Sequence, residues 1–69
     1  MDEFNLDGQE FIELNNLLKV TGLCESGGTA KISIAEGLVM VDGQVELRRR
    51  CKIRTGQIVE FAGRKVTVK

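Results

Sequence analysis

The chain has 69 residues, a formal net charge of zero at pH 7, and no histidine, proline, tryptophan or tyrosine. A chain of this length forms one domain at most, and it would bury only about 60% of the surface that its unfolded form exposes. Without histidine there is no Ser–His or Cys–His pair for catalysis, so the composition argues against an enzyme. No apolar run reaches the roughly 20 residues that a membrane-spanning helix needs.

The two cysteines, Cys24 and Cys51, do not have the CxxC spacing of a metal or redox site. We therefore expect two inert thiols, no bound metal ion and no other cofactor. Two thiols, an initiator Met1 and the lack of an apolar leader fit a reducing compartment, so we expect a cytoplasmic protein.

The zero net charge hides a segregation of charge along the chain. Residues 1–13 carry five acids and no base, whereas residues 47–69 carry eight bases and one acid. Five of these bases follow one another closely after the middle of the chain: Arg48, Arg49, Arg50, Lys52 and Arg54. Such segregation argues for an anionic partner on one face of the protein.

The first elements expected along the chain are a short strand and a helix. Residues 4–6 alternate between apolar and polar, which predicts an edge strand. Asp7 is expected to cap a helix over residues 8–20, with Glu10 in the capping-box position, and Gly22 is expected to end it. The apolar residues of this helix recur with helical spacing: Phe11, Leu14, Leu17 and Leu18.

A second helix is expected over residues 27–36, with Ser26 as its N-cap and Gly37 as its stop. Ala30 and Ile34 share its buried face. Lys31 lies about 100° further round the helix and should reach the rim or the solvent.

Short strands with tight turns follow the second helix. Asp42-Gly43 is a strong two-residue hairpin signal, because both positions need a positive φ. A turn over residues 55–57 and a second hairpin turn around Gly63-Arg64 complete the pattern. The strands themselves are expected over residues 38–41, 44–47, 58–61 and 65–68. One strand, two helices and four strands predict an α+β domain.

From about Ile12 to Ile58 the chain carries a set of features in a specific order and spacing. They are Leu17-Leu18-Lys19 with Gly22, Ser26-Gly27 with Ala30-Lys31, Ile34 with Glu36-Gly37, Val39 with Val41-Asp42-Gly43, and Gly56. As a set they resemble the RNA-binding domain named after ribosomal protein S-four, the αL motif. The chain ends resemble the extra strands of small stand-alone bacterial proteins of this type. The resemblance implies one domain over residues 1–69, with a two-helix αL motif packed on a small, mainly antiparallel sheet.

The resemblance also implies that the second helix and the hairpin after it present an RNA-binding face. Carried over by position, and with the basic stretch added, the expected RNA-binding residues are Ser26, Gly27, Gly28, Thr29, Lys31, Arg48, Arg49, Arg50 and Lys52. A glycine-rich helix start binds phosphate well, and arginine pairs bidentately with it. Glu10, Glu13 and Ala35 stand where many members carry bases, which weakens binding or shifts it towards residues 48–54.

The three phenylalanines fall on positions expected to face the core, so no aromatic platform for unpaired bases is expected. That favours a monomer that binds structured RNA by backbone and shape, such as ribosomal RNA, an assembly intermediate or transfer RNA. Two alternatives stay open. One is a protein-interaction module that docks a partner through the acidic N-terminal face; only RNA binding should weaken steeply with salt. The other is an accessory subunit that guides an RNA-modifying enzyme, which would copurify with it.

Overall fold

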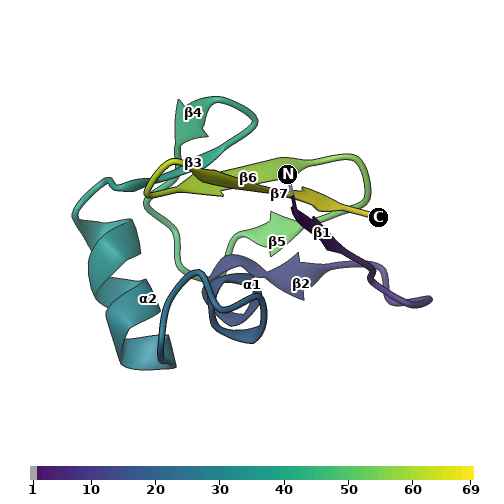
Figure 1. Ribbon diagram of the computed structural model, residues 1–69, viewed down its shortest axis with the longest axis horizontal. Coiled ribbons are helices and arrows are strands. Elements are labelled where there is room, and N and C mark those ends of the chain that lie inside the picture. Colours follow the sequence, from purple (N-terminus) through teal and green to yellow (C-terminus); the bar gives the residue numbers. More distant parts are fainter. Residues whose placement is uncertain (1) are drawn as a thin grey trace.

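The computed structural model describes residues 2–69, which form two helices and seven short strands (Figure 1). The helices are α1 (Leu14–Val20) and α2 (Gly27–Ala35). The strands are β1 (Asp2–Phe4), β2 (Ile12–Glu13), β3 (Val39–Val41), β4 (Gln44–Val45), β5 (Lys52–Ile53), β6 (Ile58–Phe61) and β7 (Arg64–Val68). Five strands make the main sheet in the order β1-β7-β6-β3-β4, and β2 pairs with β5 in a separate two-stranded ribbon. The predicted α+β class, with two helices on a mainly antiparallel sheet, is confirmed.

The core lies between the helices and the two sheets. Residues from all of these elements bury their side chains in one cluster: Leu6, Leu14, Leu17, Leu18, Cys24, Ala30, Ile34, Val39, Val41, Ile53, Val59 and Val68. Each fully buried Leu, Ile or Val side chain contributes about 1.5–3 kcal/mol to the stability of the fold relative to its exposed form. The cluster therefore fixes both helices, and the ribbon, against the main sheet.

The first and last strands lie side by side, because β1 pairs in parallel with β7 (Figure 1). The Lys69 N–H donates to the Phe4 carbonyl at 2.8 Å. Two ion pairs accompany this pairing: Arg64 Nη2 lies 2.9 Å from Asp2 Oδ2, and Lys69 Nζ lies 2.6 Å from Glu3 Oε2. The charges that the sequence separates are thus partly neutralised in space.

The first helix begins at Leu14 and not at residue 8. Asp7 and Gly8 have φ values of 54° and 89°, so they form a left-handed turn and not a helix start. The Gln9 N–H donates to the Leu6 carbonyl at 3.1 Å, which closes that turn, and the Asp7 N–H donates to Asn5 Oδ1 at 2.7 Å just before it. The predicted cap at Asp7 and the capping-box role of Glu10 are therefore wrong. Aspartate favours tight turns as well as helix N-caps, and the glycine after Asp7 favours the turn.

The second helix and the turns near it are confirmed. Ser26 is the N-cap of α2, and its Oγ accepts the Thr29 N–H at 3.2 Å. Gly37 follows the helix with a φ of 76°. Asp42 and Gly43 have φ values of 52° and 83°, as the predicted hairpin turn between β3 and β4 requires.

Several strand boundaries differ from the prediction. β3 begins at Val39, and Leu38 is 55% exposed. The last hairpin turns at Ala62-Gly63, whose φ values are 54° and 78°, so Arg64 lies in β7 opposite Phe61. The expected turn at Gly63-Arg64 is therefore one residue too late, because alanine gives no sequence signal for a left-handed position.

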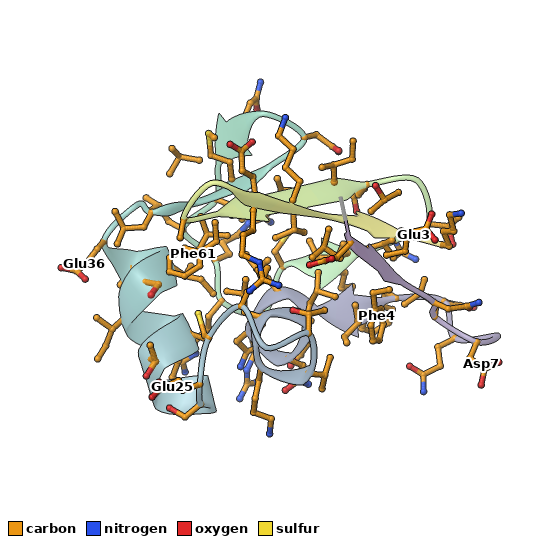
Figure 2. The ribbon with its side chains drawn as sticks, in the orientation of Figure 1. Glu3, Phe4, Asp7, Glu25, Glu36 and Phe61 are labelled. Atoms are coloured by element: carbon orange, nitrogen blue, oxygen red, sulfur yellow. The ribbon has the colours of Figure 1, made fainter. Side chains whose placement is uncertain are left out.

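Two of the three phenylalanines pack as expected. Phe4 and Phe61 are half-buried against the core, with Phe61 next to α2 and Phe4 at the opposite side of the molecule (Figure 2). Phe11 does not belong to the core cluster or to the apolar residues packed on it. The expectation that all three rings face the core is thus wrong for Phe11, because the helix that would have turned its ring inward does not include it.

Candidate nucleic-acid interface

Residues 48–51, the basic turn, form a β-turn after β4. The Cys51 N–H donates to the Arg48 carbonyl at 3.1 Å, which places Arg49 and Arg50 at the two central positions. Both side chains are exposed. Among the described residues, neither guanidinium lies within ion-pair distance of a carboxylate. Two adjacent arginines at the tip of a turn can each reach a phosphate.

The backbone of the basic turn is fastened to the start of α1. The Leu14 N–H donates to the Cys51 carbonyl at 2.9 Å, and the Asn15 N–H donates to the Arg49 carbonyl at 3.0 Å. Helix starts leave their first N–H groups without partners inside the helix, and Glu13, at the N-cap position, makes no side-chain cap. The basic turn supplies the missing acceptors, so Arg49 and Arg50 are held in a defined place beside α1.

Arg48 differs from its neighbours because its guanidinium is engaged within the protein. Nε and Nη2 donate to the two carboxylate oxygens of Glu46 at 3.0 and 3.2 Å, and the Arg48 backbone N–H donates to Glu46 Oε2 at 3.0 Å. These hydrogen bonds hold the pKa of Glu46 at about 2. The structure therefore gives Arg48 a role in shaping the basic turn, although its side chain stays 76% exposed.

The β2–β5 ribbon carries the next basic residues. Ile12 lies opposite Ile53, which is fully buried, and Glu13 lies opposite Lys52. Side chains alternate along a strand, so Lys52 and Arg54 lie on the outer face of the ribbon. Lys52 Nζ lies 5.0 Å, and Arg54 Cζ 5.6 Å, from the centre of the Phe11 ring.

The start of α2 has an open backbone. Gly28 and Thr29 are exposed, and Gly27 is half-buried. A Cβ at Gly27 would meet no atom within 4 Å, and one at Gly28 would meet only Ser26 Oγ, at 3.8 Å. The fold itself does not demand glycine at either position. Because Ser26 Oγ already accepts the Thr29 N–H, the N–H groups that a ligand could use in the first turn are those of Gly27 and Gly28.

The charges around this helix start are mixed. Lys31 is exposed on α2, whereas Glu25 lies just before the helix (Figure 2). The α2 start is therefore a weaker anion site by charge than the basic turn.

The predicted RNA-binding residues fall into two groups that flank α1. One group lies on the basic turn and β5 (Arg48, Arg49, Arg50 and Lys52), and the other lies at the start of α2 (Ser26, Gly27, Gly28, Thr29 and Lys31). α1 packs against α2, and its own start holds the basic turn. Two residues next to the first group, Arg54 and Phe11, were not among the predicted RNA-binding residues. Arg54 had a signal, its place in the basic run, whereas Phe11 was assigned to a helix that does not include it.

Both cysteines, Cys24 and Cys51, are free thiols. Burial raises the pKa of both Cys24 and Cys51, which keeps the thiols protonated. Within residues 2–69 no three His, Cys, Asp or Glu side chains lie close enough together to hold a metal ion. Neither helix in that part of the chain is long and apolar enough to cross a membrane.

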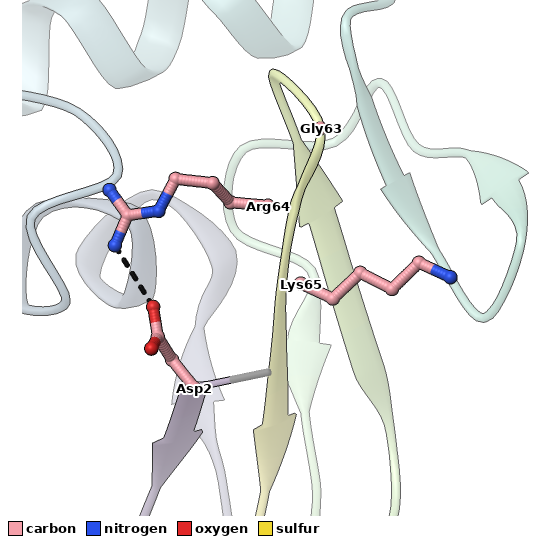
Figure 3. A pocket seen from close by; sticks show the side chains of 4 residues that line it. All are labelled: Asp2, Gly63, Arg64 and Lys65. Atoms are coloured by element: carbon pink, nitrogen blue, oxygen red, sulfur yellow. Dashed lines mark hydrogen bonds and ion pairs between the residues drawn. The ribbon is translucent and has the colours of Figure 1, made fainter.

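An open hollow of about 370 Å³ lies beside β7 and is lined by Asp2, Gly63, Arg64 and Lys65 (Figure 3). Arg64 and Lys65 point to opposite sides of the strand (Figure 3). The Arg64 guanidinium is paired with Asp2, so Lys65 is the lining base without a carboxylate partner among the described residues. One unpaired base makes the hollow a weaker anion site than the basic turn.

Comparison with known proteins gives a consistent picture. A family model described as the S4 domain matches residues 4–69. The Escherichia coli K12 protein named "Putative RNA-binding protein YbcJ" is 56% identical over 68 residues, covering 99% of this chain and 97% of that protein. The Bacillus subtilis 168 protein named "Probable ribosome maturation protein RlbA" is 37% identical over 54 residues, covering 78% of this chain and 76% of that protein. The solution structure of E. coli YbcJ, described as revealing an αL motif involved in RNA-binding, matches with a TM-score of 0.76 and covers 99% of this chain and 86% of that chain.

Proposed function

The chain belongs to the S4 domain family, and on that basis we propose that it is a non-catalytic RNA-binding protein of the bacterial cytoplasm. Its whole length, residues 1–69, would act as one domain and as a monomer. It would recognise structured RNA through the phosphate backbone and the shape of the fold. The observation that carries the proposal is the basic turn, where Arg49 and Arg50 stand exposed on a backbone fastened to α1.

The ion pairs of the fold indicate which bases would meet the RNA. Arg48, Arg64 and Lys69 are paired with carboxylates. The other bases of the C-terminal half have no such partner in the part of the chain that the structure describes: Arg49, Arg50, Lys52, Arg54 and Lys65. Four of these five lie on the basic turn or directly after it, so the positive charge available to a phosphate backbone is concentrated beside α1.

Ribosomal RNA or an assembly intermediate is the target that we favour, and transfer RNA is the other candidate. The name of the B. subtilis relative, a ribosome maturation protein, supports this choice. The small number of aromatic residues, 4% of the chain, also favours recognition of backbone and shape over a reading of many unpaired bases.

Salt titration tests the electrostatic basis of the proposal. Each phosphate neutralised changes the slope of log K against log salt by roughly −0.7 to −0.9, so three to five contacts give a total slope of about −2 to −4.5. Fluorescence anisotropy with a labelled ribosomal RNA hairpin, between low and moderate salt, measures that slope. An affinity that does not change with salt would refute the proposal. Crosslinking in cells, followed by sequencing of the bound RNA, would identify the target.

The first alternative is docking of a protein through an acidic N-terminal face. Asp2 and Glu3 are engaged in ion pairs with β7 and the C-terminal residue, so the acids left for such a partner are Asp7, Glu10 and Glu13. An accessory subunit that guides an RNA-modifying enzyme would use the same RNA-binding residues. Recovery of a stoichiometric enzyme with the protein would favour that second alternative.

A further inference from the structure

The Phe11 ring is an aromatic surface placed among the bases of the candidate interface. Phe11 directly precedes β2, is half-buried, and lies outside the core cluster. Lys52 Nζ and Arg54 Cζ lie 5.0 and 5.6 Å from its ring centre. We call these three residues the ribbon site.

The two cations of the ribbon site are exposed and have no carboxylate partner among the described residues, although Glu13 faces Lys52 across the ribbon. Both cations lie over the Phe11 ring. An exposed cation–π contact is weak, so both long side chains can leave the ring at small cost. The ribbon site therefore joins a flat apolar surface to two positive charges that are free to move.

From this arrangement we propose that the ribbon site stacks one unpaired nucleobase of the bound RNA on Phe11. Lys52 and Arg54 would then move from the ring to the phosphates on either side of that nucleotide. The stacked base and the two new phosphate contacts together replace the two weak cation–π contacts that are displaced. The inference rests on the proposed function and narrows it: the RNA is a helix interrupted by a bulged or looped-out nucleotide.

The position of the ribbon site lets one RNA element reach it and the basic turn together. Lys52 follows Cys51 directly, and an extended strand advances about 3.3 Å per residue. The Cα atoms of Arg50 and Arg54 are therefore roughly 13 Å apart at most. The arginines of the turn would hold the backbone of the paired stem. Phe11 would hold the base that leaves the stem, which gives the complex a fixed register.

Two RNA hairpins with the same stem test the inference, one uninterrupted and one with a single bulged 2-aminopurine. The native protein should bind the bulged hairpin about tenfold more tightly and change the 2-aminopurine fluorescence as the base stacks. Phe11→Leu should remove most of this preference and leave affinity for the uninterrupted hairpin within twofold. Phe4→Leu is the matched control, because Phe4 is also half-buried but packs on the core. It should leave the preference intact.

Phe11→Trp is a second variant that keeps an aromatic ring at this position, so the test does not depend on the folding of Phe11→Leu. The chain has no tryptophan, so the new indole is the only one, and it should keep the preference while its fluorescence responds to the bulged hairpin. Equal binding of both hairpins by the native protein, or an unchanged preference in folded Phe11→Leu, would overturn the inference and leave the proposed function standing. Failure of the native protein to bind either hairpin would overturn both.

Discussion

Charge reversal at the tip of the basic turn separates RNA binding from folding. Arg49→Glu with Arg50→Glu changes the local charge by four units. Both side chains are exposed, and the hydrogen bond that fastens the turn at Arg49 uses its backbone carbonyl, which the substitution keeps. Surface substitutions of this kind change the free energy of unfolding by only about 0.5 kcal/mol. We therefore expect an unchanged circular-dichroism spectrum and nearly the same melting temperature.

The effect on RNA binding should be much larger than the effect on stability. Two phosphate contacts disappear and two repulsive charges replace them, so the affinity should fall at least tenfold, which is about 1.4 kcal/mol or more. The slope of log K against log salt should become shallower by about 1.4–1.8, because two fewer counterions are released. Anisotropy titrations of the double variant at several salt concentrations measure both quantities.

Two controls make the result specific to the basic turn. Lys65→Glu reverses an exposed charge on β7, and it should change the affinity far less than the double variant does. Glu10→Gln with Glu13→Gln should leave binding equal or slightly tighter. A folded double variant that still binds RNA within twofold of the native protein would refute the reasoning, and the basic turn would then be only a solvated surface.

Three further predictions concern the helix start, the last hairpin and the ion pair of the basic turn. Gly28→Ala should stabilise the fold by about 0.5–1 kcal/mol, because the new Cβ fits at 3.8 Å from Ser26 Oγ. RNA affinity should fall at least threefold if a phosphate lies on that backbone, and an unchanged affinity would remove the α2 start from the interface. Ala62→Asn should raise the melting temperature by roughly 2–8 °C without changing RNA binding, since asparagine tolerates the left-handed φ of 54°, and a lower melting temperature would contradict this. Glu46→Gln should destabilise the protein by less than about 1 kcal/mol at neutral pH. Because folding lowers the pKa of Glu46 to about 2, that difference should vanish as the pH falls from about 4.3 to about 2 in urea unfolding.

The parts of the fold that could be predicted are those with local signals. Ser26 caps its own helix, and Asp42-Gly43 makes a turn between neighbouring strands, so a short stretch of sequence contains all the partners. The β2–β5 ribbon could not be predicted in this way. Its strands have two residues each, too few to show a period, and Ile12 pairs with Ile53, which is distant in the sequence. The missed ribbon also explains why the first helix was placed too early.

The sequence predicted which residue types make the candidate site, but not how the fold holds them in place. The run of arginines can be seen directly in the sequence, and the structure places Arg49 and Arg50 on an exposed turn. The turn is held by two hydrogen bonds to the backbone carbonyls of Arg49 and Cys51. Every residue has a backbone carbonyl, so the residue types give no signal for these hydrogen bonds. Phe11 was missed for a related reason: its spacing from Leu14 fits a helical stripe, and only the ribbon shows that it lies among the bases.

The pairing of the chain ends changes what the charge distribution means for RNA. Eight bases in the last third of the sequence suggest an extended basic face, but β1 brings Asp2 and Glu3 to Arg64 and Lys69, and Glu46 holds Arg48. Apart from Lys65 on β7, the unpaired positive charge of this part of the described chain is therefore concentrated in a small area beside α1. A contact area of that size accounts for three to five phosphates, and it is why the expected salt slope is about −2 to −4.5 and not the roughly −6 to −7 that eight contacts would give.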